Sequence, residues 1–512
     1  MLIRKIPRFL ILLLFTSLLA SACQPAGMPL ESGALATSAS QGQAAALPDS
    51  GQAAAQATPS YPRRPLYSPG ELVDYTAQGG DTLQLLARRF NTSVAEILEA
   101  NTFIPASATT MPAGMPMKIP IYYLPLWGSP YRILPDSLFV NGPAQVNFNT
   151  QEFIDKRTGW LKYYETYVSH ANRSGAQIVD MVARDYSVSP RLLLALLEYK
   201  SGALSQPSLP AAQEEFALGG EGWSHKGLYL QLTWAANLLN NSYYGFKNMQ
   251  LSQLEFHDGR IENFDPWQNA ASVSLMFYFN TVFEYPEYLQ AISPEGFARI
   301  YASLFGDPWQ NEQAHIPGSL VQPEFILPFQ PGDVWALTGG PHTAWGIGNP
   351  LAALDFAPPS KTSGCVPSGV WATAVSPGVV VRSEEGQVML DLDGDGDERT
   401  GWNVFYLHVG TESRVPLGVV MKQGDPIGHP SCEGGAATGT HIHIARKYNG
   451  EWVSAEGMGG VLAFTLEGWE AHNGRQPYLG TLTRFSQVVT ACTCSNAASF
   501  IQSDRRAPEA SR

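Results

Sequence analysis

The stretch Gly439-Thr440-His441-Ile442-His443-Ile444-Ala445 decides the expected fold of the C-terminal part of this chain. Successive side chains of an extended strand point to opposite faces, so His441 and His443 share one face while Ile442 and Ile444 share the other. The isoleucine face can pack into a core. We therefore expect a β-strand that presents two imidazoles to one site.

Further candidates for metal ligands lie upstream of this strand. A catalytic zinc needs three protein ligands and an open position for water. The candidates are His342, Asp355 in the middle of an apolar run, and His408 directly after the strand-like run Val404–Leu407. A single histidine elsewhere is more often a hydrogen-bonded structural residue. We assign that role to His170, His225, His257, His315, His429 and His472.

This order of His, Asp, a Tyr-Leu-His strand and His-x-His resembles the lysostaphin-type zinc endopeptidases, which cut peptidoglycan peptides. The resemblance covers roughly residues 325–465 and implies an all-β antiparallel domain over 325–480. It implies that His342, Asp355 and His443 bind Zn²⁺. It also implies that His441 is the general base, and that His408 hydrogen-bonds the developing oxyanion or orients the attacking water.

One feature departs from the family pattern. About three residues usually separate the first His from the Asp, whereas here the segment Trp345–Pro350 lies between His342 and Asp355. We expect this insert to loop out of the domain, because loops tolerate insertions at modest entropic cost. Whether it restricts the cleft is left open.

The N-terminus has the layout of a secretory signal over residues 1–22. Cations precede the apolar run Phe9–Leu19, and the small residues Ala20-Ser21-Ala22 precede Cys23. This arrangement resembles a bacterial lipoprotein cleavage site, which implies lipidation of Cys23 and a membrane anchor outside the cytoplasm, in the cell envelope. The alternative is a plain secretory signal. Residues 23–69 are rich in Ala, Ser, Gln, Gly and Pro, so we expect a disordered tether.

Length and charge limit the class of protein. The 512 residues suffice for about three domains. With 45 acidic and 32 basic residues, the net charge is -13. A nucleic-acid surface needs clustered cations, so we expect no nucleic-acid partner.

Four cysteines remain after Cys23. In an oxidising compartment they can form two disulfides by any of three pairings. The simplest pairing joins Cys365 to Cys432 between loops of the C-terminal domain, and leaves Cys492 and Cys494 to pair locally.

Residues 70–122 form the first expected folded unit. The markers Tyr75-Thr76, Gly80-Asp81-Thr82-Leu83 and Ile119-Pro120 resemble a LysM module, a small βααβ domain that binds N-acetylglucosamine-containing glycans. From the helical apolar stripe alone, any small α+β domain would fit. In the family, glycan binds around the first strand–helix loop and the second helix–strand loop. The resemblance implies these glycan-binding candidates: Gly80, Asp81, Thr82, Asn101, Phe103 and Ile104.

Residues 128–315 have the periodicity of a mainly α domain, with helices expected at 176–186, 190–198, 235–240, 270–283 and 297–305. The stretch Val188–Gly202 resembles the catalytic helix of lysozyme-like lytic transglycosylases. Their acid is a Glu directly before Ser-Gly, a place that Lys200 occupies here. A lysine cannot replace a carboxylic acid of raised pKa. We expect a non-catalytic lysozyme-like domain with a glycan-binding or structural role.

The acidic stretch Asp391–Glu398 has carboxylates at alternating positions, as in a calcium loop. Asp391, Asp393 and Asp395 are the candidate ligands. The twelfth position of such a loop holds Trp402 in place of Glu, and an acidic hairpin tip explains the pattern equally well. Residues 481–512 have little core-forming pattern and are expected to be a tail.

These expectations describe a multidomain, cell-wall-bound zinc metalloendopeptidase whose partner is peptidoglycan. The alternative is a non-enzymatic peptidoglycan-binding regulator of other wall hydrolases. The retained His and Asp set favours the enzyme.

Overall fold

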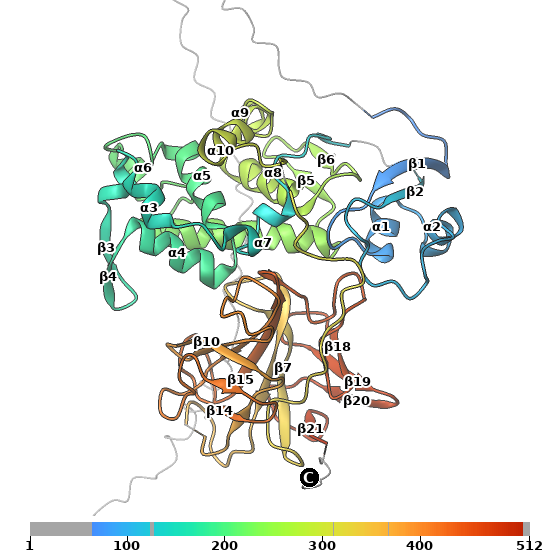
Figure 1. The fold of residues 1–512 in the computed structure, drawn as a ribbon, viewed down its shortest axis with the longest axis vertical. Coiled ribbons are helices and arrows are strands. Elements are labelled where there is room, and N and C mark those ends of the chain that lie inside the picture. The colour runs from blue at the N-terminus through green and yellow to red at the C-terminus, as the bar shows by residue number, and fades with distance from the viewer. Residues whose placement is uncertain (1–63, 123–126, 311, 367, 505–512) are drawn as a thin grey trace, which may run out of the picture. The chain divides into compact units, whose positions relative to one another are not determined.

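A computed structural model describes residues 64–122, 127–310, 312–366 and 368–504 of the chain (Figure 1). The expected signal, the lipidation site Cys23 and nearly all of the expected tether lie outside the described residues. Among the helices that the structure describes, none is both long and apolar enough to cross a membrane.

The first unit has the expected βααβ order. It consists of β1 (Glu71–Thr76), α1 (Leu83–Arg89), α2 (Val94–Ala100) and β2 (Pro116–Ile121), with β1 antiparallel to β2. Helix α1 begins after Thr82, whose hydroxyl accepts a hydrogen bond from the Leu85 amide. Helix α2 begins with a capping box between Ser93 and Glu96. Local capping chemistry therefore fixes both helix starts.

The middle unit is mainly α, and the expected helical segments are present. Its helices are α3 (Thr150–Asp155), α4 (Gly175–Tyr186), α5 (Pro190–Ser201), α6 (Ala211–Glu215), α7 (Leu228–Lys247), α8 (Ala270–Val282), α9 (Tyr285–Ala291) and α10 (Phe297–Phe305). Short 3-10 turns occur at η1 (Asp136–Leu138), η2 (Pro143–Gln145), η3 (Trp160–Tyr163) and η4 (Trp223–His225). Two small hairpins join β3 (Glu165–Val168) to β4 (Ala171–Ser174) and β5 (Gln253–Glu255) to β6 (Ile261–Asn263).

The C-terminal unit is all β and its strand pairings are antiparallel. Its main sheet has the order β13-β10-β11-β12-β15-β8-β7-β21, and β16 also pairs with β15. These strands are β7 (Val334–Thr343), β8 (Leu351–Ala357), β10 (Gly378–Glu384), β11 (Gln387–Asp391), β12 (Trp402–Leu407), β13 (Val420–Met421), β15 (Ile442–Tyr448), β16 (Glu451–Trp452) and β21 (Phe500–Gln502).

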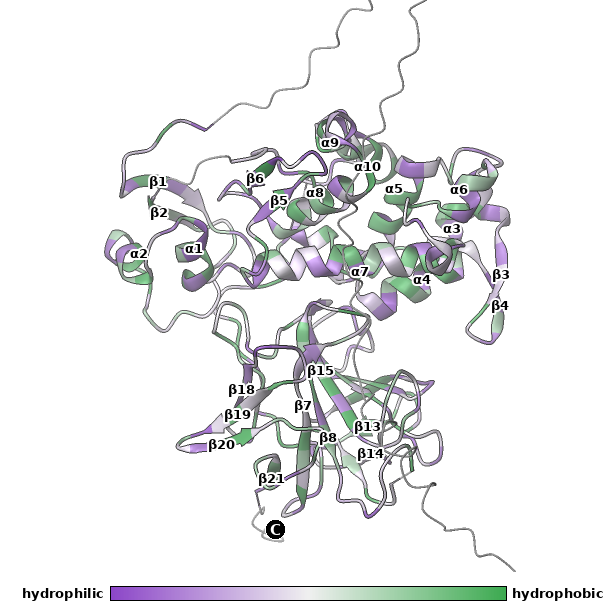
Figure 2. Cartoon of the chain, turned by 180° about the vertical axis from the view of Figure 1, so that it is seen from behind, coloured by the Kyte–Doolittle hydropathy of each residue, from purple (hydrophilic) through white to green (hydrophobic). Residues whose placement is uncertain are grey.

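Smaller sheets accompany the main sheet. Strand β9 (Ala372–Thr373) pairs with β14 (Pro426–Gly428). A four-stranded sheet comprises β17 (Thr465–Leu466), β18 (Trp469–Asn473), β19 (Gly480–Arg484) and β20 (Gln487–Thr490). Hydrophobic and hydrophilic segments alternate along β15 (Figure 2). Ile442 and Ile444 of this strand are fully buried in the core, as the period of two predicts.

The segment expected to be a tail differs from that expectation. Strand β21 pairs with β7 at the edge of the main sheet, and β20 completes the four-stranded sheet. These strands are three and four residues long. Segments this short give too few apolar repeats to be recognised from periodicity.

A buried charged cluster joins the middle and C-terminal units. The Glu451 carboxylate on β16 accepts hydrogen bonds from Lys247 Nζ (2.6 Å) and Tyr243 Oη (2.8 Å), both on α7, and lies 2.6 Å from His315 Nε2. Burial alone would raise the pKa of Glu451, but Lys247 and His315 outweigh burial and hold this pKa at about 2. The ionised carboxylate is therefore part of the folded state.

This cluster predicts a pH-dependent stability. The pKa of Glu451 is lowered from 4.5 to about 2, so the carboxylate stabilises the fold above pH 4.5 and this contribution is lost as the pH falls toward 2. We expect Glu451→Gln to reduce the free energy of unfolding by about 3 kcal/mol at neutral pH. In urea unfolding followed by fluorescence, the difference in the free energy of unfolding between Glu451→Gln and the wild type should shrink as the pH falls from 4.5 toward 2. Glu152→Gln, at an exposed ion pair with Lys156, is the matched control and should change stability little.

Candidate metal centre

Neighbouring strands bring the candidate ligands together. Strand β8 lies between β15 and β7 in the main sheet. His443 on β15 is directly opposite Asp355 on β8, and His342 lies near the end of β7 where that strand pairs with β8. The antiparallel register therefore places three side chains from distant parts of the sequence on one face.

The donor atoms of these side chains converge in a buried place. His342 Nε2 lies 3.0 Å from His443 Nδ1. Asp355 Oδ1 lies 3.2 Å from His342 Nε2 and 3.3 Å from His443 Nδ1. The three side chains are buried, and each offers one ligand atom within 4.8 Å of the others. Among the described residues, Asp355 Oδ1 has no hydrogen-bond partner.

Backbone carbonyls fix the tautomers of both histidines. His342 Nδ1 lies 2.8 Å from Gly340 O, and His443 Nε2 lies 3.2 Å from Ala344 O. A carbonyl only accepts hydrogen bonds, so these nitrogens carry the hydrogens and the two opposed nitrogens carry lone pairs. Two lone pairs and a carboxylate oxygen that face one another repel unless a cation lies between them. This donor set fits Zn²⁺.

The position of Asp355 depends on a glycine opposite it. A Cβ on Gly339 would lie 2.4 Å from Asp355 Oδ2, so any other residue would displace the carboxylate. Burial alone would raise the pKa of Asp355, but the adjacent His342 and His441 hold it well below its ordinary value. The carboxylate is therefore anionic at neutral pH and available to a cation.

Two further histidines line the site, as the sequence predicts. His441 Nδ1 lies 2.7 Å from Gly439 O, and His408 Nδ1 lies 2.8 Å from Glu433 O. The same tautomer argument leaves a lone pair on Nε2 of each ring. The two ring centroids are 4.5 Å apart, and His441 Nε2 lies 3.6 Å from Asp355 Oδ1. Burial, together with His441 and His443, lowers the pKa of His408 to about 3, so His408 is neutral.

The insert before Asp355 loops out of the sheet and is bound by helix α7. Asn237 Oδ1 accepts a hydrogen bond from the Ile347 amide (2.8 Å). Asn241 Nδ2 donates to Ile347 O (3.0 Å), and Asn241 Oδ1 accepts from the Asn349 amide (2.6 Å). The helical domain thus holds the loop that separates two of the ligands. This contact could not be predicted from the sequence, because these asparagines lie on a helix about a hundred residues upstream of the insert.

Tyr478 is a neighbour of the site that the sequence did not indicate. Its ring stacks on His342 at a centroid distance of 4.2 Å, and its backbone N–H and C=O bond Pro341 O and the Gly340 amide. It lies between β18 and β19, beyond the region of family resemblance. A lone tyrosine in a Gly- and Pro-containing loop carries no sequence signal.

Comparisons with known proteins find matches to the first unit, to the helical unit and to bacterial proteases. A family model of the LysM domain matches residues 75–120, and a model described as LasA, N-terminal domain, matches residues 132–318. The chain is 26% identical over 345 residues to Protease LasA of Pseudomonas aeruginosa, covering 63% of this chain and 75% of that protein. It is 27% identical over 143 residues to the beta-lytic metalloendopeptidase of Lysobacter enzymogenes, covering 28% of this chain and 76% of that protein. The chain is thus similar to a protease and to a metalloendopeptidase, and part of it matches the LysM domain.

Among solved structures, the chain is similar to the M23 metalloprotease pseudoalterin, with 22% identity, 33% of this chain and 96% of that chain covered, and a TM-score of 0.28. Its helical domain falls within the match to the LasA N-terminal domain. The lysozyme-like character of that domain stays a prediction. Lys200 lies with its ammonium 3.9 Å from the centroid of the Phe283 ring, and burial lowers its pKa to about 8.

The glycan-binding candidates of the LysM module lie in different environments. Asp81 and Thr82 are buried, and Asp81 pairs with Arg89. Asn101 is also buried, and its side chain hydrogen-bonds the backbone of Ile97 and Lys118. Ile104 is buried, whereas Phe103 is exposed. Gly80 lies next to Lys247 of the helical domain. Most of these residues therefore face the protein interior.

The carboxylates of the acidic loop lie close together. One oxygen each of Asp391, Asp393 and Asp395 lies within 4.8 Å of the others. Backbone amides within the loop donate hydrogen bonds to these carboxylates, as in a self-contained hairpin tip, and calcium binding stays a prediction.

The structure pairs Cys365 with Cys432 and Cys492 with Cys494.

The donor set predicts stoichiometric zinc binding. We expect one zinc per chain in the wild-type protein and strong loss of bound zinc in His443→Ala, because the two remaining donors are too few to hold the ion. Metal analysis after gel filtration measures this. His257→Ala, an exposed histidine far from the site in sequence, should retain the full metal content. Equal zinc in both variants would contradict the assignment.

The contact of α7 with the insert predicts an effect at a distance. Asn241→Ala removes two hydrogen bonds to the insert, so we expect faster amide exchange at Ile347 and Asn349 and about tenfold weaker zinc binding. Hydrogen exchange and zinc titration measure the two effects. Thr233→Ala on the same helix, whose hydroxyl bonds Leu230 O, is the control. Unchanged exchange of the insert would show that α7 does not hold it.

Proposed function

We propose that the chain hydrolyses peptide bonds in the stems or cross-bridges of peptidoglycan. The observation that carries the proposal is the convergence of His342, Asp355 and His443 beside two further histidines whose Nδ1 atoms face backbone carbonyls, which leaves their Nε2 atoms available. Such a set combines a metal-binding face with a proton acceptor. Together these two functions can activate water and transfer its proton in the hydrolysis of an amide.

His342, Asp355 and His443 would hold the zinc ion, which when bound lowers the pKa of water and polarises a peptide carbonyl. His441 accepts the proton of the attacking water at Nε2, because its Nδ1 is committed to Gly439 O. The same nitrogen then gives the proton to the leaving amine. The hydrogen bond to Gly439 also stabilises the imidazolium that forms between these two steps.

His408 has the other role that the sequence left open for it, orientation of the water. Its Nδ1–H donates to Glu433 O, so Nε2 of the neutral ring can accept a hydrogen bond but cannot donate one. An oxyanion needs a donor. We therefore assign His408 to positioning the attacking water and not to stabilising the oxyanion.

The LysM module supports peptidoglycan as the substrate, because the family binds N-acetylglucosamine-containing glycan. The helical domain has Lys200 where a lysozyme-like acid would stand, so we infer that it does not cleave glycan. Its place is structural, through the contacts of α7 with the insert and with Glu451. Calcium in the loop Asp391–Asp395 is retained as a secondary proposal, tested by calcium titration.

We further propose that the protein is attached to the membrane outside the cytoplasm by a lipid on Cys23. The signal-like sequence before Cys23 supports this proposal. Metabolic labelling with a fatty acid tests it, with Cys23→Ser as the unlabelled control.

The proposed reaction is tested with the zinc-loaded full chain and purified peptidoglycan. We expect soluble muropeptides with new amino termini, and a loss of at least about a hundredfold in rate for His441→Ala. Mass spectrometry of the released fragments identifies the bond. His257→Ala is the control that should cleave normally.

Two results would contradict the proposal. Release of fragments with new reducing ends and intact peptides would indicate a glycosidase in the helical domain. No release from several wall types, despite one bound zinc per chain, would favour a peptidoglycan-binding regulator of other hydrolases.

A further inference from the structure

Residues 314–320, here called the strap, connect the helical domain to the C-terminal β domain. The strap lies against the LysM module on the two loops where the family binds glycan. These loops are residues 77–82, between β1 and α1, and residues 101–115, between α2 and β2. The Met111 amide donates to Asp81 O (2.7 Å), so the two loops form one continuous surface.

The strap hydrogen-bonds the second loop around a turn of its own backbone at residues 318–319. The Ser319 amide donates to Thr110 O (2.9 Å). Thr110 Oγ1 donates to Pro317 O (2.7 Å) and accepts from the Leu320 amide (3.0 Å). Thr109 Oγ1 donates to Leu320 O (2.9 Å). Four hydrogen bonds thus join three strap residues to two neighbouring threonines of the loop.

The strap also touches the first loop closely. A Cβ on Gly79 would lie 2.9 Å from Ala314 Cβ, and a Cβ on Gly80 would lie 3.7 Å from Ile316 Cγ1. Ile316 is fully buried. The strap therefore contacts both loops, and Thr110 and Ile316 are fully buried at these contacts.

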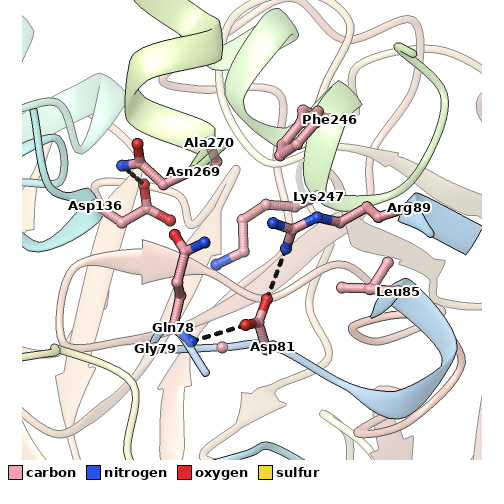
Figure 3. Close-up of a pocket in the computed structure, with 11 residues that line it drawn as sticks. Gln78, Gly79, Asp81, Leu85, Arg89, Asp136, Phe246, Lys247, Asn269 and Ala270 are labelled. Carbon is pink, nitrogen blue, oxygen red and sulfur yellow. Dashed lines mark hydrogen bonds and ion pairs between the residues drawn. The ribbon is translucent and has the colours of Figure 1, made fainter. Parts of the chain in front are cut away.

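A second segment of the helical domain holds the module on the strap. Arg89 of α1 donates to Pro266 O (2.7 Å) and Gln268 O (2.7 Å), and Gln78 donates to Trp267 O (3.1 Å). Figure 3 shows Gln78, Asp81 and Arg89 around the same pocket as Asp136, Lys247 and Asn269. That pocket has a volume of about 20 Å³, which holds a water molecule but no sugar ring.

We propose that the strap occupies the glycan-binding groove of the LysM module as a ligand from the same chain, and that N-acetylglucosamine-containing glycan must displace it to bind. This inference rests on the glycan binding included in the proposed function. The competition is reciprocal, so glycan that binds the strap-free module loosens the strap. The strap continues into the domain interface, where Asn449 Nδ2 donates to His315 O (2.6 Å). Wall binding would thereby change the contact between the helical and β domains.

The test compares the full chain with a variant whose strap fits the groove less well. A Cβ on Gly318 would lie 2.6 Å from Pro112 Cγ, and Gly318 has no positive φ that would itself strain the backbone. Gly318→Ala therefore strains the contact between the strap and Pro112 while leaving the sequence of the module unchanged. Gly369→Ala, where a Cβ meets no atom within 4 Å, is the matched control.

Calorimetry with the β-1,4-linked hexamer of N-acetylglucosamine measures the affinity of each protein. We expect Gly318→Ala to bind the hexamer about tenfold more tightly than either the wild type or Gly369→Ala. A tenfold change in affinity is typical of the coupling between two sites. Equal affinity in all three proteins would overturn the proposal. So would an absence of binding in all three, and that result would leave the endopeptidase activity unaffected.

Hydrogen exchange gives an independent readout on the unmodified protein, should Gly318→Ala fold poorly. A saturating concentration of the hexamer should accelerate exchange of the Ser319 and Leu320 amides, which donate to Thr110 in the strap-bound state. Binding of the hexamer with unchanged exchange at these amides would show that glycan binds elsewhere and would also overturn the proposal.

Discussion

The antiparallel register between β8 and β15 is the constraint on which the site depends. It places His443 opposite Asp355, and the register between β7 and β8 brings His342 beside both. A shift of one residue in β15 would turn His443 into the core and expose Ile442 and Ile444 in its place. The apolar face of β15 therefore fixes the register that keeps His443 on the metal-binding face, because the apolar core cannot accept the histidine. The alternation of apolar residues and histidines along β15 therefore specifies both how the strand packs and where its histidines lie.

The sequence predicted the parts of the site that depend on local periodicity and chain order. His441 and His443 share a face because a strand has a period of two, and the family order of ligands supplied His342, Asp355 and His408. The tautomers required the structure, since they depend on backbone carbonyls at Gly340, Ala344, Gly439 and Glu433. Only those contacts decide between the two roles that His408 had on sequence grounds.

Long-range contacts account for what the sequence did not reveal. The helices of the middle domain and the βααβ order follow from apolar stripes and capping residues, which are local signals. The docking of the insert on Asn237 and Asn241, the stacking of Tyr478 on His342, and the pairing of β21 with β7 join segments far apart in the chain. None of these residues differs from an ordinary surface residue in its local sequence pattern.

The buried cluster around Glu451 has a consequence for how the three folded units are related. Its carboxylate belongs to the β domain, while its partners Lys247 and His315 belong to the helical domain and the strap. A β domain separated from the other units would expose the Glu451 carboxylate and an apolar surface, both of which are buried in the whole chain. The helical and β domains are therefore not independent of one another in stability. A different domain placed beside this β domain would have to supply its own cation at the position of Lys247 Nζ.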